Sequence, residues 1–203
     1  MAALPASVER LRILNTSLPD SCFLLQSQSD PLDEARLAEI DLSNSSQLTS
    51  REAYRITKVW PHVTTIKLNR CINAFFSPDV LHIFDNLDRL EVLEANDALL
   101  SEWHISKICR NFRTLRRLSI AGSQLNYRSA LWIASTLTKL ESLDVSDCRR
   151  LHPVAIFQFV NLRPTLRFLY ISISETNVAC FSGSVDQLRL CMPACDIVYY
   201  SQS

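Results

Sequence analysis

The chain has 203 residues, and 47% of them are hydrophobic, which is enough for a continuous core. Lysine plus arginine and aspartate plus glutamate number 21 each, so no bulk charge would attract nucleic acid or an anionic lipid surface. No apolar run approaches the roughly 18 residues of a membrane-spanning helix, and no secretory signal pattern opens the chain. We therefore expect a soluble, folded protein that spans no membrane, binds no nucleic acid and recognises its partner locally.

The cysteines are scattered and lack the regular spacing of a small disulfide-bonded domain. They are Cys22, Cys71, Cys109, Cys148, Cys180, Cys191 and Cys195. Reduced thiols fit this pattern best, which favours a cytoplasmic or nuclear location. Arg10 and Arg12 near the start leave a mitochondrial location as the alternative.

Residues 1–36 are predicted to form a degenerate first repeat that caps the core. Val8, Leu11 and Ile13 have the spacing of inward-pointing strand residues, and Thr16 follows at a position reserved for small side chains. Residues 27–34, which include a proline, interrupt the helical pattern, so we expect irregular structure there.

Residues 37–178 contain a repeated apolar pattern, L-x-x-L-x-L, whose starts lie near residues 37, 63, 90, 115, 140 and 166. The triplets are Leu37/Ile40/Leu42, Val63/Ile66/Leu68, Leu90/Leu93/Ala95, Leu115/Leu118/Ile120, Leu140/Leu143/Val145 and Leu166/Leu169/Ile171. Eight residues after each start lies a small side chain, namely Ser45, Cys71, Ala98, Ser123, Cys148 and Ser174. Small side chains suit a tightly stacked turn, so Cys71 and Cys148 are predicted to be structural.

The second half of each repeat changes from the strand period of two to a helical period. The predicted buried stripes are Ala53/Ile56/Thr57/Trp60, Val80/Ile83/Phe84/Leu87, Ile105/Ile108/Cys109/Phe112, Ala130/Ile133/Ala134/Leu137 and Ile156/Phe159/Val160/Leu162. Helix starts are predicted at Thr49 with Glu52, at Ser77-Pro78 and at Ser101-Glu102. With only two glycines in the chain, the turns must use Asn and Asp: Asn44, Asn69, Asn73, Asn96, Asp97, Asn126 and Asp147.

Residues 179–203 are predicted to close the array. A last helix is expected over residues 184–192, and Pro193 ends it. Residues 196–200 are predicted to form a final strand that pairs with the sixth repeat and leaves its outer edge open. The fold class is therefore α/β, a solenoid with a parallel sheet on the concave face and helices on the convex face.

The units LESLDVSDCRRL, from residue 140, and VTTIKLNRCI, from residue 63, resemble leucine-rich repeats of the cysteine-containing subtype. This resemblance covers residues 37–178 and is best known from F-box proteins. It implies a substrate-recognition or adaptor subunit of a cullin-type ubiquitin ligase that recruits a Skp1-like adaptor. The residues ahead of the array contain no recognisable F-box. Short proteins of similar architecture also include mitochondrial assembly factors, so the alternative is a non-catalytic assembly factor of a larger complex.

In this repeat the residues between the apolar positions form the concave sheet surface, where solenoids bind protein partners. Opposite charges alternate there, with Lys67 between Asp41 and Glu94, and Arg116 between Glu91 and Glu141. Such pairs stabilise neighbouring strands. The candidate partner-binding residues lie towards the C-terminal end, because aromatic and guanidinium groups gather there: Arg116, Arg117, Arg167, Phe168 and Tyr170.

The sequence predicts no catalytic site, no cofactor and no metal site. The four histidines, His62, His82, His104 and His152, fall in different repeats, where we expect capping or surface roles. Cys191 and Cys195 form the closest cysteine pair, but a proline lies between them and no second pair follows. Two isolated glycines cannot build a phosphate-binding loop. The predicted function is therefore non-catalytic protein binding.

Overall fold

A computed structural model describes residues 8–14, 37–76, 87–173 and 178–201 of the chain. Eight strands form one parallel sheet in which each strand pairs with the next along the sequence. The strands are β1 (Arg10–Arg12), β2 (Glu39–Asp41), β3 (Thr65–Lys67), β4 (Val92–Glu94), β5 (Arg117–Ser119), β6 (Ser142–Asp144), β7 (Phe168–Ile173) and β8 (Asp196–Ser201). This sequential order is a solenoid-like arrangement.

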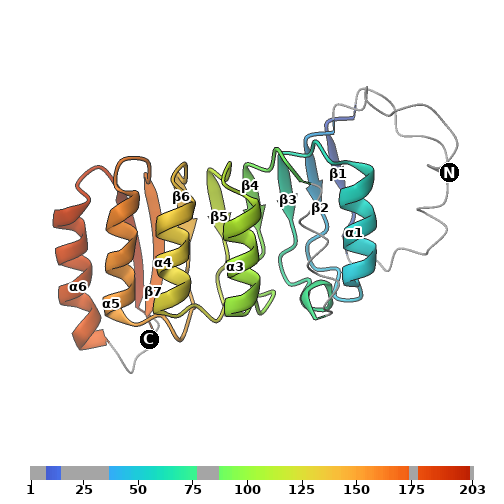
Figure 1. Cartoon of the computed structure of the whole chain (residues 1–203). Coiled ribbons are helices and arrows are strands. Elements are labelled where there is room, and N and C mark those ends of the chain that lie inside the picture. The colour runs from blue at the N-terminus through green and yellow to red at the C-terminus, as the bar shows by residue number, and fades with distance from the viewer. Residues whose placement is uncertain (1–7, 15–36, 77–86, 174–177, 202–203) are drawn as a thin grey trace, which may run out of the picture.

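The helices lie in a row on one side of the sheet (Figure 1). The described α-helices are α1 (Ser50–Val59), α3 (Glu102–Asn111), α4 (Tyr127–Thr136), α5 (Pro153–Ile156) and α6 (Val178–Cys191), and 3-10 helices span Ile72–Phe75 (η3) and Phe157–Leu162 (η4). None of the helices in the described ranges combines the length and the apolar character that crossing a membrane requires.

The predicted repeat alignment is confirmed by the strand register. The central residue of each triplet pairs directly with the next one along the chain: Ile40, Ile66, Leu93, Leu118, Leu143 and Leu169. All six are at most 3% exposed. The N-terminal strand was predicted too, since Leu11 pairs with Ile40. The core is therefore a continuous layer between the sheet and the helices.

A ladder of left-handed residues turns the chain after five of the strands, β2 to β6. Its members lie seven residues after the first five repeat starts: Asn44, Arg70, Asp97, Gly122 and Asp147. The backbone N–H at Arg70 donates to the Asn96 carbonyl at 2.8 Å, and the equivalent bonds at Asn44, Asp97 and Gly122 have lengths of 2.7–2.9 Å. Arg70 was not predicted at such a turn. The backbone of Arg70 is held in the left-handed conformation by the hydrogen bond from its N–H to the next repeat.

The small position behind this ladder is buried as predicted, and Cys71 and Cys148 are 0% and 4% exposed. Their thiols point at the carbonyls of Leu42, at 3.0 Å, and Ile120, at 3.6 Å. Burial raises the pKa of Cys71 to about 11 and that of Cys148 to about 12. Both thiols are therefore protonated packing groups at neutral pH.

Helix starts follow the predicted capping chemistry. Thr49 and Glu52 form the expected capping box, in which the Thr49 N–H donates to Glu52 at 2.7 Å. At α3 the Ser101 N–H donates to Nδ1 of His104 at 2.9 Å, so this ring nitrogen carries no proton. Burial lowers the pKa of His104, which favours the same neutral form. His152 caps α5, so these two histidines have the capping roles expected of them.

The fifth repeat departs from the predicted single helix. Its chain forms the short α5 and then the tighter η4, although Ile156, Phe159 and Leu162 remain buried as expected. Val160 lies in the 3-10 segment and is only half-buried, although it still packs against the core. Predictions at Thr16, Cys22, Ser77-Pro78, Val80, His82, Ile83, Phe84, Ser174 and residues 27–34 lie outside the described residues.

The two described glycines provide a matched pair for testing the turn ladder. Gly122 has φ +74°, whereas Gly183 lies exposed in α6, where an added Cβ atom would have no neighbour within 4 Å. We expect Gly122→Ala to lower the free energy of unfolding by about 1–2 kcal/mol, because an L-residue is strained there. Gly183→Ala should raise it by about 0.5–1 kcal/mol through helix propensity. Urea unfolding measures the free energy of unfolding of both variants. Equal effects of the two substitutions would contradict the role of Gly122 as a left-handed turn residue.

Candidate functional site

The side of the sheet opposite the helices, here called the open face, is not covered by any described helix (Figure 1). In each repeat the residues that flank the buried central residue point onto it. In β5, for example, Leu118 is fully buried, while Arg117 is exposed and Ser119 half-buried. The open face is thus built from alternate strand residues that are free of core packing.

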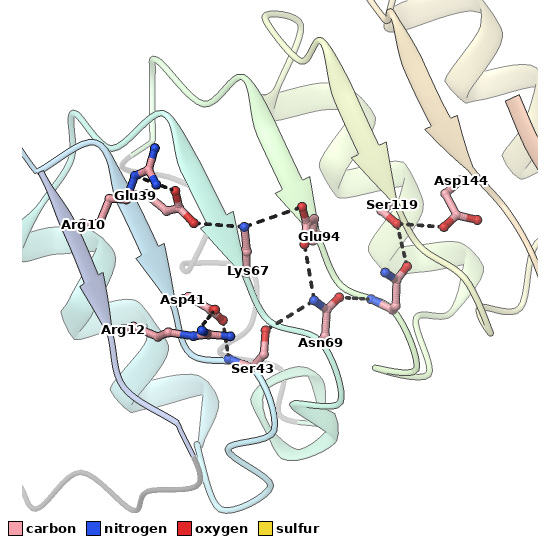
Figure 2. Close-up of polar contacts among 11 residues, drawn as sticks. Arg10, Arg12, Glu39, Asp41, Ser43, Lys67, Asn69, Glu94, Ser119 and Asp144 are labelled. Atoms are coloured by element: carbon pink, nitrogen blue, oxygen red, sulfur yellow. Dashed lines mark hydrogen bonds and ion pairs between the residues drawn. The ribbon is translucent and has the colours of Figure 1, made fainter. Parts of the chain in front are cut away.

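The N-terminal half of the open face is closed by ion pairs (Figure 2). Arg10 lies 3.4 Å from Glu39, and Arg12 lies 2.9 Å from Asp41. Lys67 extends the chain of charges, because its Nζ lies 2.9 Å from Glu39 and 4.0 Å from Glu94. These contacts link four neighbouring strands.

The predicted pairing of Lys67 with Asp41 is corrected in part. Asp41 is directly opposite Lys67 in the register, but its carboxylate is already occupied by Arg12 and by the Ser43 N–H at 3.0 Å. Lys67 therefore contacts Glu39 instead, and this hydrogen bond is the main reason that the pKa of Lys67 is raised. The charge of Asp41 still adds to that rise. The predicted contact between Lys67 and Glu94 is confirmed, but at 4.0 Å it is a long ion pair.

Asparagine side chains continue the network across the middle of the sheet. The Asn69 amide donates to Ser43 at 3.3 Å and accepts the Asn96 N–H at 2.9 Å (Figure 2). Asn96 in turn accepts the Ser119 hydroxyl at 2.8 Å, and Ser119 also lies 3.1 Å from Asp144. These polar groups therefore stabilise the sheet and leave few free donors or acceptors on the strands they connect.

Arg116, one of the five candidate partner-binding residues, also belongs to this stabilising network. Its guanidinium lies 2.6 Å from Glu141 and 3.8 Å from Glu91, as the alternating charges predicted. All three side chains are about half exposed, so the net stabilisation is small. Arg116 is nevertheless held by two carboxylates and is the least available of the five candidate residues.

The other four candidate residues lack such partners. No ion pair or side-chain hydrogen bond joins Arg117, Arg167, Phe168 or Tyr170 to any residue in the described part of the chain. The register explains this for Arg117, whose neighbours Val92 and Ser142 are uncharged. Phe168 is 46% exposed, and Tyr170 is half-buried. We call these four residues the C-terminal patch.

Within the C-terminal patch, the structure places Arg117 and Phe168 on one register line but not in direct contact. Arg117, Ser142 and Phe168 are consecutive partners across β5, β6 and β7. Two strand spacings separate Arg117 from Phe168, which is about 10 Å. Asp144 lies on β6, between these two strands, and pairs in register with Ser119 and Tyr170. Asp144 was not among the candidate residues predicted from the sequence.

A second exposed apolar row lies on the helix layer, and sequence reasoning missed it. Trp103, Tyr127 and Val154 occupy the first turns of α3, α4 and α5 and are 42%, 48% and 58% exposed. Arg128 bridges two of these turns, since it lies 3.6 Å from Glu102. The signal was present in the sequence as an apolar residue just after each N-cap. This row is the natural comparison surface for the C-terminal patch.

Metal-binding and nucleophilic groups do not gather in the described residues. No cluster of three or more metal-ligating side chains occurs among them. Burial raises the pKa values of the Cys109 and Cys195 thiols to about 11, so neither is an activated nucleophile. The arrangement on the open face offers recognition by charge and aromatic surface.

Comparison with known proteins finds no match, either among protein-family models or among curated proteins. The repeat geometry and the chemistry of the open face are therefore the basis for the function proposed below.

The two halves of the open face predict different effects of removing a positive charge. Lys67→Gln should lower the free energy of unfolding by about 0.5–1 kcal/mol, because Lys67 is 28% exposed and contacts two glutamates. Arg117→Gln should change it by less than about 0.5 kcal/mol, since the Arg117 side chain has no ion-pair or hydrogen-bond partner among the described residues to lose. Urea unfolding at low and high salt measures the difference. A larger effect at Arg117 than at Lys67 would contradict the division.

Proposed function

We propose that the chain is a leucine-rich-repeat protein of the cysteine-containing subtype that binds another protein on the concave side of its sheet. The constant register of the triplets, the left-handed turn ladder and the buried small position support this assignment. In this proposal residues 37–178 are the repeats, and residues 1–36 and 179–203 cap the two ends of the horseshoe.

The observation that carries the proposal is the asymmetry of the open face. Charged groups in β1 to β4 neutralise one another, whereas the side chains of the C-terminal patch, Arg117, Arg167, Phe168 and Tyr170, form no ion pair or side-chain hydrogen bond with the described residues. Arginine, tyrosine and other aromatic residues dominate the binding energy of protein interfaces. The C-terminal patch is therefore the proposed contact surface.

The patch defines the chemistry of its partner. Phe168 and Tyr170 offer an apolar surface, and Arg117 and Arg167 flank it with guanidinium groups that bind carboxylates bidentately. A fitting partner segment presents an apolar side chain with acidic residues on either side. Neutral overall charge is compatible with such local recognition.

The proposed role is non-catalytic. Its sharpest form is the substrate-recognition or adaptor subunit of a ubiquitin ligase, with a Skp1-like adaptor as a further partner, and this form is supported by the repeat subtype alone. A stoichiometric assembly factor, in mitochondria or elsewhere, would use the same face. Copurification separates the two roles, because a ligase subunit recovers cullin components and an assembly factor comigrates with a large complex.

Affinity capture from native cells with quantitative mass spectrometry tests the contact surface. The triple variant Arg117→Ser, Phe168→Ala, Tyr170→Ser should lose at least about 90% of the specific partner signal, since hot-spot truncations each cost about 2 kcal/mol or more. Lys67→Gln on the same face and Trp103→Ser with Tyr127→Ser on the helix layer should retain the partner. Circular dichroism confirms folding. Retention by the triple variant, or loss with the helix-layer variant, would refute the proposal.

A further inference from the structure

The C-terminal strand β8 is an edge strand of the sheet, and it is longer than β1, the edge strand at the other end. It pairs with β7 over six residues, from Phe168↔Asp196 to Ile173↔Ser201, whereas the strands from β1 to β6 pair over three. Backbone groups of successive strand residues point alternately to the two sides of the strand. The Asp196 N–H donates to the Arg167 carbonyl at 2.7 Å, so residues 196, 198 and 200 face β7. Residues 197, 199 and 201 therefore point to the opposite edge.

The repeat shows what that outer edge is built to hold. In five preceding repeats the residue equivalent to Tyr199 donates its N–H to the following strand, at distances of 2.7–3.0 Å. These residues are Leu42, Leu68, Ala95, Ile120 and Val145. Ile171 continues the series and pairs in register with Tyr199. No strand follows β8 among the described residues, and none of those residues accepts the Tyr199 N–H as the following strand does in the earlier repeats.

Little in the described structure protects this edge from pairing. Edge strands are commonly guarded by charge or by short length, and β1 fits that rule with two arginines in three residues. In contrast, β8 is apolar and aromatic, with its single charge at Asp196. One guard is present, because Arg189 of α6 donates to the Ile197 carbonyl at 3.4 Å and is itself 3.3 Å from Asp186. A carbonyl has two lone pairs, so this contact leaves the carbonyl able to accept a second bond.

We propose that β8 pairs with β8 of a second copy of this chain, antiparallel and about a two-fold axis at Tyr199. Outward-pointing groups then meet only outward-pointing groups, and Tyr199 of each copy exchanges both backbone bonds with its counterpart. The same register keeps the helices of both copies on one side, so two sheets become one. This is a closed, isologous arrangement.

The sequence of β8 is self-complementary in this register. Ile197 lies opposite Ser201, and Val198 lies opposite Tyr200, a β-branched and aromatic pair of the kind that stabilises antiparallel strands. Asp196 falls outside the paired segment, so the carboxylates of the two copies do not oppose each other. The open faces and the C-terminal patches remain uncovered at their own strands, so the pairing is independent of the proposed partner binding.

Sedimentation velocity over a concentration series tests the pairing with two variants of one residue. Tyr199→Pro removes the outward N–H, which makes no bond to the described part of the chain, and Tyr199→Thr removes the same side chain but keeps the N–H. Wild type and Tyr199→Thr should form dimers below about 100 µM, and Tyr199→Pro should weaken the dimer at least about tenfold. A wild type that stays monomeric, or a dimer that tolerates the proline, overturns the proposal.

Amide hydrogen exchange of the wild type gives a second readout that does not depend on how the proline variant folds. The Tyr199 and Ser201 amides should exchange at least about tenfold more slowly at high protein concentration than at low concentration. The Val198 amide, which faces β7, is the internal control and should change little. Equal exchange of Tyr199 at both concentrations overturns the proposal.

Discussion

The hydrogen bond from each strand to the next, held in a constant register, is the interaction on which the rest of the structure depends. Each repeat buries its apolar triplet only because the neighbouring repeat supplies the matching triplet and the matching backbone groups. The left-handed residue at the end of each strand keeps this register, since its own N–H bonds to the following turn. Stability therefore comes from nearest neighbours, and the side chains of the open face are free for other uses.

Those side chains are used differently along the sheet. Across β1 to β4 they form alternating ion pairs that link neighbouring strands, and the asparagine ladder carries the network to β6. The register line through Arg117 is not part of this network, because its neighbours Val92 and Ser142 are uncharged and β7 supplies Phe168. A surface whose polar groups are already satisfied has little to gain from a partner. The side chains of the C-terminal patch can still gain contacts, and this supports the proposed role of the patch in recognition.

Much of the fold was predictable because the same sequence pattern recurs in every repeat, so each structural feature is indicated several times. The strands, the buried small position and the final edge strand follow from apolar spacing alone. Choices between near-equal local contacts were not predictable. Lys67 contacts Glu39 because Arg12 occupies Asp41, and Arg70 takes a left-handed turn usually given to Asn or Gly. The C-terminal patch was predicted by residue type, but the separation of its side chains from the ion pairs of the other described residues was visible only in three dimensions.

The central claim is that a protein partner covers the C-terminal patch of the open face. Side-chain footprinting of the complex tests this claim most directly. Hydroxyl radicals report the exposure of individual aromatic rings, and the chain carries such rings on both surfaces. We predict that Phe168 and Tyr170 lose reactivity when the partner is bound, while Trp103 and Tyr127 keep theirs. Loss of reactivity at Trp103 and Tyr127, with Phe168 and Tyr170 unchanged, would contradict the claim.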